Sequence, residues 1–535
     1  MTHEWREEVP PLPPPPPQWR LDMDLRHHIQ HCACTCNHMG YGNYMDYQGE
    51  MPPRQYLEAA AFAEYQGEVP PCNCMDCANY MEYQMQMEMC RAQCMSEVPQ
   101  GTRMVNGSAR YNHQGRLIPA PRGSVTSSSS DDERLELRPW VVACLAVVVI
   151  GGIGLGIAFL LSGGDSLEEE RLEMLDTVRR ILTEVPLIDG HNDLPWNIRK
   201  FVHNQLGRFN FSEDLTQIDP WSKSNWSHTD LPRLKAGMVG AQFWSAYVPC
   251  GAQHMDAVQV AMEQIDVIKR LTQIYSNDLQ FVTTAAGIKE AHKSGRIASL
   301  IGVEGGHSLG SSLGVLRMFH GLGARYLTLT HTCNTPWAGC CVGNDTTEPD
   351  GLAHFGRLVV RELNRLGMLV DLSHTSFRTM EHALNVSTAP VIFSHSSAFA
   401  ICNSNRNVPD YILKLVALNG GIVMVNFYTH FISCNQTATM EDVIAHINHI
   451  RKVAGEDHVG IGAGYDGINT TPEGLEDVSK YPELLAALLA TGDWTEDQLK
   501  KLAGLNMLRV MTRAEQVKME TPEPIEPSSG PIITN

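Results

Sequence analysis

Eight short apolar segments, separated by amphipathic stretches, constrain the fold of this chain more than any other feature. They cover residues 187–193, 239–247, 298–304, 325–331, 368–374, 390–395, 421–427 and 459–466. Their apolar character is continuous, which is typical of parallel strands buried on both faces. The stretches between them, such as 255–275, 355–366, 376–384, 411–418 and 440–453, have helical patterning. Eight such units predict an α/β fold of the (β/α)8 barrel type, and an open doubly wound sheet is the alternative.

Polar residues capable of binding metal end most of these segments. They are His191 and Asp193, Glu304, His331, His374, His395 and Asp466. A barrel brings the carboxyl ends of its strands to one face, where active sites lie. Burying seven such groups without partners would cost several kcal/mol for each. The pattern therefore predicts a functional cluster at this face.

Imidazole and carboxylate ligands without thiolates suit zinc in an open catalytic site. His191 and Asp193 are two residues apart, so an extended strand directs both to one side. His374 and His395 supply neutral imidazoles, and the carboxylate of Glu304 has two oxygens that could bridge two ions. Two ions about 3.5–4 Å apart would bring the pKa of a shared water near 7. The residues thus predict hydrolysis by a metal-bridging hydroxide.

The amino-terminal part of the chain has a different composition. A proline run at 13–17, a degenerate repeat and a polar tract at 127–133 indicate a disordered arm over residues 1–138. Residues 140–161 contain no charged side chain and are long enough to cross a bilayer, which predicts a transmembrane helix at 139–162. Arg134 and Arg138 precede this segment and acidic residues follow it, so the arm is expected in the cytoplasm. The prediction is a single-pass type II protein of the cell membrane with an extracellular domain at 163–520 and a flexible tail at 521–535.

Other features agree with an extracellular domain and limit its partners. The formal charge of −19 argues against nucleic-acid binding. The proline run could bind an SH3 or WW domain or could be an unbound linker. Six cysteines beyond the span favour disulfides, although their connectivity cannot be derived from sequence. Candidate glycosylation sites beyond the span are Asn210, Asn225, Asn344, Asn385, Asn435 and Asn469.

Seven motifs resemble the membrane (renal-type) dipeptidase family over roughly residues 167–516. They are HNDLPW from 191, GVEGGHS from 302, YLTLTHTCNTPW from 326, DLSH from 371, FSHS from 393, RNVPD from 406, and YDG from 465 with GLEDVS from 474. The resemblance implies a (β/α)8 barrel hydrolase that cleaves dipeptides with two zinc ions per subunit and is typically a homodimer. It assigns His191 and Asp193 to one zinc, His374 and His395 to the other, and Glu304 to the bridge.

The resemblance also implies roles for residues around the ions. His331 would contact the scissile carbonyl and stabilise its oxyanion. Arg406 would pair with the free carboxylate of the substrate, and Asp466 would handle the proton passed to the leaving amine. Among the cysteines, it pairs Cys250 with Cys333 and Cys402 with Cys434. His307, three residues after Glu304, is a weaker ligand candidate that could equally be structural.

Three departures from the family pattern affect what can be expected. Gly464 stands where the family has an acidic or amide residue, which puts the rate or substrate preference in question. Cys340 and Cys341 have no counterpart, and the polar stretch 523–535 does not suit a carboxyl-terminal lipid anchor. A catalytically silent adhesion or receptor module on the same barrel is the alternative function. That alternative predicts the loss of a zinc ligand, and all five are present.

Overall fold

The computed structural model describes residues 169–342 and 350–520. The predicted arm, the predicted span at 139–162 and the tail lie outside these residues, so they stay predictions. Among the helices of the described part, none combines the length and the apolar character that crossing a bilayer requires.

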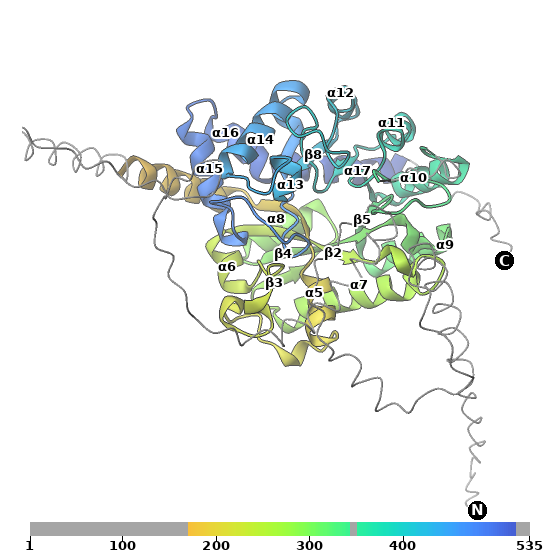
Figure 1. Cartoon of the computed structure of the whole chain (residues 1–535), viewed down its shortest axis with the longest axis horizontal. Helices are drawn as coiled ribbons and strands as arrows, with labels where there is room; N and C mark the ends of the chain where they lie inside the picture. Colours follow the sequence, from red (N-terminus) through yellow and green to blue (C-terminus); the bar gives the residue numbers. More distant parts are fainter. Residues whose placement is uncertain (1–168, 343–349, 521–535) are drawn as a thin grey trace, which may run out of the picture. The chain divides into compact units, whose positions relative to one another are not determined.

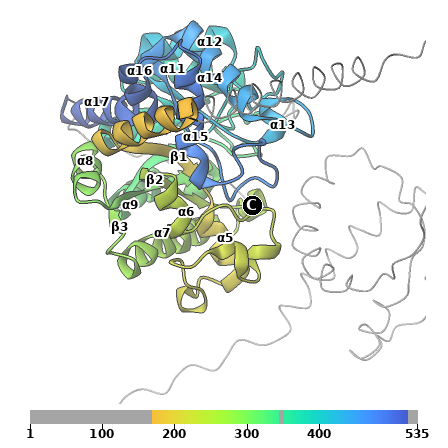
Figure 2. The ribbon, with the colours of Figure 1, turned by 90° about the vertical axis from the view of Figure 1, so that its left-hand side faces the viewer.

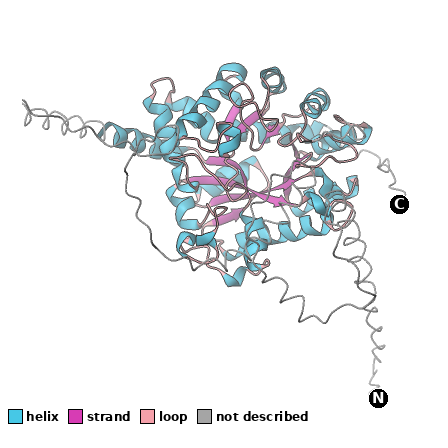
Figure 3. Ribbon diagram, in the orientation of Figure 1, coloured by secondary structure: helices cyan, strands magenta, loops and turns pink. Residues whose placement is uncertain are grey.

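Eight parallel strands close into a barrel, which confirms the predicted fold and excludes the open sheet. In spatial order they are β1 (Leu187–Asn192), β2 (Val239–Tyr247), β4 (Ile297–Glu304), β5 (Ala324–Thr328), β6 (Leu369–Asp371), β7 (Ile392–Phe393), β8 (Ile422–Val425) and β9 (Val459–Ile461). Pairing of β2 with β4 and of β9 with β1 completes the closure. Figure 3 shows the strands at the centre of the domain with helices around them.

One additional strand was not predicted from the sequence. β3 (Leu279–Phe281) pairs with the first residues of β4, and β5 pairs with the later residues of β4 on the same edge. Several barrel strands also end earlier than their apolar segments do. β6 stops at Asp371 and β7 at Phe393, so His374 and His395 lie on the turns that follow these strands. Their side chains therefore do not follow the alternation of inward and outward side chains along a strand, and both can point to the same site.

Helices cover the outside of the barrel (Figures 1 and 2). They are α5 (Leu194–Val202), α6 (Leu231–Ala236), α7 (Ala257–Ile274), α8 (Ala285–Lys293), α9 (Leu313–Leu322), α10 (His354–Leu366), α11 (Phe377–Val386), α12 (Asp410–Asn419), α13 (Thr429–Ile432), α14 (Met440–Ala454), α15 (Tyr481–Ala490), α16 (Glu496–Lys500) and α17 (Asn506–Glu520). The five predicted helical stretches correspond to α7, α10, α11, α12 and α14. A helix over 169–184 precedes the barrel, and Arg180 and Glu184 join it to α16 by ion pairs.

Glycines allow two strands to approach the end of β7 closely. A Cβ at Gly462 would lie 1.8 Å from the carbonyl oxygen of Ser394, and one at Gly190 would lie 2.4 Å from the same oxygen. Backbone cannot yield as a flexible side chain can, so neither position has room for a methyl group. Because Ser394 precedes His395, this packing fixes the backbone from which a predicted metal ligand projects.

Replacing Gly462 by alanine is therefore expected to destabilise the folded domain by about 2–3 kcal/mol, measured as the free energy of unfolding in denaturant. Gly207→Ala is the matched control, since a Cβ at Gly207 meets no atom within 4 Å. Equal stabilities of the two variants would contradict this account of the packing.

Candidate metal centre and substrate site

The barrel brings the predicted metal ligands to the carboxyl ends of its strands. His191 belongs to β1 and Glu304 ends β4, whereas His374 and His395 follow β6 and β7. Asp193 follows β1. Its Oδ2 is only 2.0 Å from the position that a Cβ on Gly467 would occupy. All five side chains are almost fully buried. Residues separated by more than 200 positions thus form one cluster.

Glu304 lies at the centre of this cluster, and its two oxygens face different imidazoles. Oε2 is 3.4 Å from His191 Nε2 and accepts a hydrogen bond from Ser245 Oγ. Oε1 is 3.2 Å from His374 Nε2 and 3.5 Å from His395 Nε2. A carboxylate with oxygens turned to separate donors has the arrangement of a bridging ligand.

The imidazoles are packed ring against ring with their Nε2 atoms inward. His191 stacks on His395 with ring centroids 3.8 Å apart, and the Nε2 atoms of His374 and His395 are 2.9 Å apart. Burial, reinforced by Arg406 and the other imidazoles, lowers the pKa of both His374 and His395 well below the usual value. Neutral rings leave lone pairs available for a metal ion.

A buried carboxylate outside the cluster fixes the tautomer of His395. Asp371 accepts the hydroxyl proton of Ser394 at 2.7 Å, so Ser394 Oγ can accept a proton from Nδ1 of His395 at 2.8 Å. The Nε2 of His395 then carries the lone pair and points into the cluster. Asp371 also accepts hydrogen bonds from Thr328 and from the backbone of Ser373 and Ser394. Neither Asp371 nor Ser394 was assigned a role from sequence, although both lie inside motifs identified there.

Tyr326 does the same for His191. Its hydroxyl donates to the carbonyl of Gly190 at 3.3 Å and lies 2.9 Å from His191 Nδ1, so it accepts the Nδ1 proton. The tyrosine ring covers Gly302, where a Cβ would be only 1.9 Å from it. Gly302 on β4 thus leaves room for Tyr326, which orients the predicted ligand His191 on β1. Nothing in the sequence separates Tyr326 from an ordinary core aromatic residue.

The donor set fits divalent metal ions. His191, Glu304 and His395 offer ligand atoms within 4.8 Å of one another, and so do Glu304, His331 and His374. Within 169–342 and 350–520, no lysine or arginine forms an ion pair with Glu304 or Asp193. Two buried carboxylates with no ion pair to a lysine or arginine of these two ranges provide a site that a divalent cation can occupy. These two groups place His374 and His395 apart, whereas the family resemblance assigns them to the same ion. The assignment of ligands to individual ions therefore stays a prediction.

Arg406 and His331 lie beside the cluster. The guanidinium of Arg406 is buried against the ring of Phe431, 5.2 Å from its centroid, and donates to Ser396 Oγ and to the carbonyl of His395. Its Nε has no hydrogen-bond partner among the described residues. His331 Nε2 is 4.0 Å from Glu304 Oε1, and Tyr247 packs edge-on against its ring. Arg406 and His331 are therefore both close enough to contact a molecule bound at the cluster.

Asp466 is buried and held by the chain around it. Its carboxylate accepts hydrogen bonds from Asn197 Nδ2 and from the backbone of His228, and its own N–H donates to Nδ1 of His228. Burial raises its pKa to about 6, although these hydrogen bonds oppose the shift. Asp466 and His374 adopt the left-handed backbone conformation, with φ of 64° and 66°. Such a conformation costs on the order of 1–3 kcal/mol for a residue other than glycine, so the surrounding structure must hold both residues in place.

The remaining predicted residues have varied surroundings. The disulfides join Cys250 to Cys333 and Cys402 to Cys434, the pairs that the resemblance implies. Cys340 and Cys341 are buried and belong to neither disulfide. Gly464 has a φ of 76°, and a Cβ there would meet only Ile468 at 3.9 Å. Four sequon asparagines are exposed, namely Asn210, Asn225, Asn385 and Asn435; Asn469 is half-buried, and Asn344 lies outside the described residues.

Comparison with known proteins agrees with this geometry. The sequence model of the membrane dipeptidase family, peptidase family M19, matches residues 175–524. Dipeptidase 3 of Macaca fascicularis is 48% identical over 355 residues, which cover 65% of this chain and 69% of that protein. Dipeptidase 3 of Mus musculus is 48% identical over 341 residues, covering 63% and 66%. The matches therefore span about two thirds of the length of these relatives.

Two solved structures are similar to the barrel. One is a dipeptidase AC described as a metallopeptidase of family M19, with a TM-score of 0.55 and 29% identity over 62% of this chain and 98% of that one. The other is a metallopeptidase of Rhodobacter sphaeroides bound to a phosphinate mimic of the dipeptide L-Ala-D-Ala. It has a TM-score of 0.54 and 28% identity over 62% of this chain and 99% of that one.

Removing the hydroxyl that orients His395 should weaken metal binding. Ser394→Ala is expected to lower zinc affinity about 10–100-fold, since partners of ligating histidines contribute that much. The measurement is zinc retained in competition with a chromophoric chelator. Ser222→Ala removes a comparable hydrogen bond to exposed Asp219 and serves as the control. Unchanged affinity in Ser394→Ala would show that the hydroxyl does not support the ligand.

Proposed function

The chain belongs to the membrane dipeptidase family, peptidase family M19, and is thus a dipeptidase hydrolase; we propose that it cleaves dipeptides with two zinc ions held by His191, Asp193, Glu304, His374 and His395. The observation that carries this proposal is the convergence of these side chains: His191, His374 and His395 lie within 3.5 Å of Glu304, and Asp193 lies 3.1 Å from His191. A catalytically silent barrel module has no need of two buried carboxylates surrounded by imidazoles.

Zinc bound at these ligands would supply a hydroxide shared between the ions as nucleophile and would polarise the scissile carbonyl. The chain's own contribution to the ligands is their orientation. Glu304 presents one oxygen to each side of the site, while Ser394 and Tyr326 keep Nε2 of His395 and His191 directed inward. Because these positions are fixed before the substrate binds, little reorganisation is needed during the reaction.

Three residues would act on the dipeptide itself. Arg406 would bind the free carboxylate, since its buried guanidinium has an N–H without a partner in the described part of the chain. His331, beside Glu304 Oε1, would donate to the oxyanion that forms at the scissile carbonyl. Asp466 would accept a proton and pass it to the leaving amine, a role suited to a carboxyl group with a pKa of about 6. We assign His331 and Asp466 as catalytic residues on these grounds, and Glu304 because its two oxygens face different imidazoles of the proposed metal site.

The setting of the enzyme is also a proposal. The uncharged segment at 139–162 would anchor a type II protein in the cell membrane and leave the barrel outside. The disulfides and the exposed sequon asparagines suit an oxidising, glycosylating compartment. Homodimerisation and SH3 or WW binding by the proline run stay predictions.

Turnover should require His374. His374→Ala is expected to lower dipeptide hydrolysis by at least about 10³-fold, because it removes an imidazole from a site that acts as a unit. The full chain is assayed on L,L- and L,D-dipeptides together with its zinc content. The control is His292→Ala, which changes a half-exposed histidine on α8. Wild-type rates in His374→Ala, or activity that survives complete zinc removal, would reject the proposal in favour of a silent barrel.

The pH profile should report the ionisation of Asp466. Since its pKa is about 6, the carboxylate is protonated below that pH and cannot accept a proton. We therefore expect kcat/KM to rise with pH through about 6 and to level off above it. Asp466→Asn should lose about 10²–10⁴-fold in rate together with this limb. An unaltered limb in the variant would assign the ionisation to another group.

A further inference from the structure

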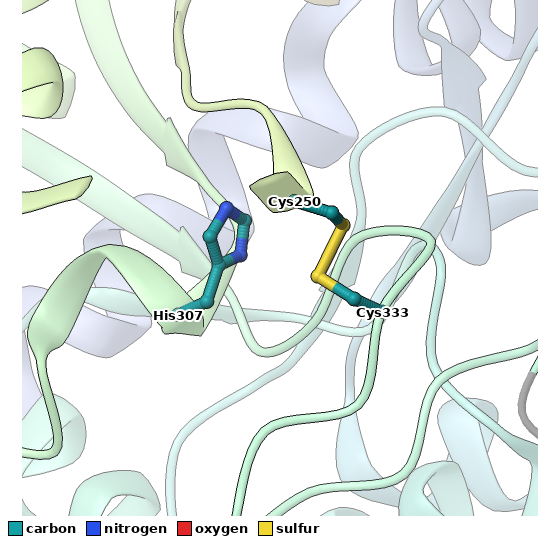
Figure 4. Close-up of side chains that lie close together, drawn as sticks. All are labelled: Cys250, His307 and Cys333. Atoms are coloured by element: carbon teal, nitrogen blue, oxygen red, sulfur yellow. A yellow bond between two sulfur atoms is a disulfide. The ribbon is translucent and has the colours of Figure 1, made fainter. Parts of the chain in front are cut away.

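The disulfide between Cys250 and Cys333 lies against His307 (Figure 4). The three residues come from the segments that follow β2, β4 and β5, so they are brought together by the barrel and not by local sequence. The two Sγ atoms and a ring nitrogen of His307 all lie within 4.8 Å of one another. The proposed dipeptidase mechanism uses none of these residues.

The imidazole of His307 is oriented by hydrogen bonding to the backbone that follows β2. Its Nε2–H donates to the carbonyl of Val248 at 2.9 Å, which leaves the lone pair on Nδ1. The side chain is only 4% exposed, and Nδ1 has no hydrogen-bond partner among the described residues. Figure 4 shows the ring edge with a nitrogen turned toward the sulfur atoms. A buried acceptor without a donor is unfavourable, and a metal ion bound to Nδ1 would remove this penalty.

Two cysteine sulfurs and one imidazole form a ligand set for zinc when the sulfurs are thiolates. The disulfide bond occupies the sulfurs in the structure described here. We propose that reduction of Cys250–Cys333 creates a second metal site, in which both thiolates and His307 Nδ1 bind a thiophilic divalent cation such as Zn²⁺ or Cd²⁺. Soft ligands of this kind differ from the imidazole and carboxylate ligands around Glu304, so the two sites differ in preference.

The chemistry of forming the site balances with an external reductant. A phosphine donates two electrons to the disulfide and is oxidised to a phosphine oxide, whose oxygen comes from one water molecule. The disulfide accepts these electrons and the two protons of the water, and becomes two thiols. Binding of the cation then releases the two thiol protons to solvent. Both cysteines are half-buried and Thr332, beside Cys333, is exposed, so a small reductant can reach the bond.

The site adjoins a residue of the proposed mechanism, and this consequence rests on the proposed function. Cys250 Sγ is 3.9 Å from His331 Nδ1, and Thr332 Oγ1 is 3.1 Å from the same nitrogen. A cation held by Cys250 would have His331 Nδ1 as a further donor. Drawing this ring toward the thiolates would remove its Nε2 from the neighbourhood of Glu304 and so inhibit hydrolysis.

Binding is tested by titrating Cd²⁺ into the zinc-loaded full chain, before and after phosphine reduction, and recording the sulfur-to-cadmium charge-transfer absorption. The reduced wild type should bind one more thiolate-ligated Cd²⁺ per chain than the reduced double variant Cys250→Ser/Cys333→Ser. The other cysteines are common to both proteins and cancel in the comparison. Identical titrations would overturn the proposal, and this readout does not depend on any turnover.

The role of His307 is tested by His307→Gln, whose amide can still donate to the Val248 carbonyl but offers no equivalent of Nδ1. After reduction, this variant should bind the additional Cd²⁺ at least about tenfold more weakly than wild type, while its unreduced form hydrolyses dipeptides normally. Equal affinity would remove His307 from the site and overturn the proposed ligand set.

Inhibition is tested separately by adding Zn²⁺ in slight excess to the reduced enzymes. Wild type should lose at least about tenfold in kcat, and the double serine variant should not. Equal inhibition of the two proteins would overturn the link to His331. Absence of dipeptidase activity in every protein before reduction would instead contradict the proposed function and leave the cadmium result standing.

Discussion

The carboxylate of Glu304 at the end of β4 is the group on which the arrangement of the site depends. Four imidazole nitrogens lie within 4.0 Å of its two oxygens, and Asp193 adds a second carboxylate next to His191. Burial raises the pKa of Glu304, so its charged form is unfavourable in this position unless cationic groups or metal ions stabilise it. The barrel therefore has stability to gain from metal as well as chemistry to perform with it.

Around this centre the domain uses a layer of buried hydrogen bonds to hold the ligands. Asp371 links β5, β6 and β7 and acts on His395 through Ser394. Asp189 accepts hydrogen bonds from Gln242, Tyr481, and the backbone of Ala463 and His191, and so joins β1, β2, β9 and α15. Burial raises the pKa of Asp189 to about 6, against the effect of those hydrogen bonds. Both aspartates lie on strands, so the support is built into the rigid part of the fold.

The loops beyond the strands carry the residues that we propose to contact a substrate. The Cys250–Cys333 disulfide joins the loops after β2 and β5 and lies on the flank of His331. Arg406 reaches the cluster by donating to the carbonyl of a ligand, His395, so the proposed carboxylate anchor and metal site share one segment of backbone. Loop residues carry the polar contacts because a rigid barrel can position them from below. Because Cys250 lies next to His331, we expect a change at Cys250 to affect the proposed reaction.

The sequence alone predicted the barrel, which the structure confirms, and it named the residues that the proposed metal site uses. Continuous apolar segments predict buried parallel strands, and the polar residues that end most of these segments are then expected at the carboxyl end of the barrel. It could not provide β3, whose three residues carry no periodicity, or the supporting roles of Tyr326, Asp371 and Ser394. These side chains are ordinary core or turn residues until the closed sheet places them against a histidine from a distant strand. The position of the His307 lone pair beside a disulfide is likewise decided by tertiary structure, because three loops from different strands have to meet there. It also depends on which ring nitrogen donates to the carbonyl of Val248.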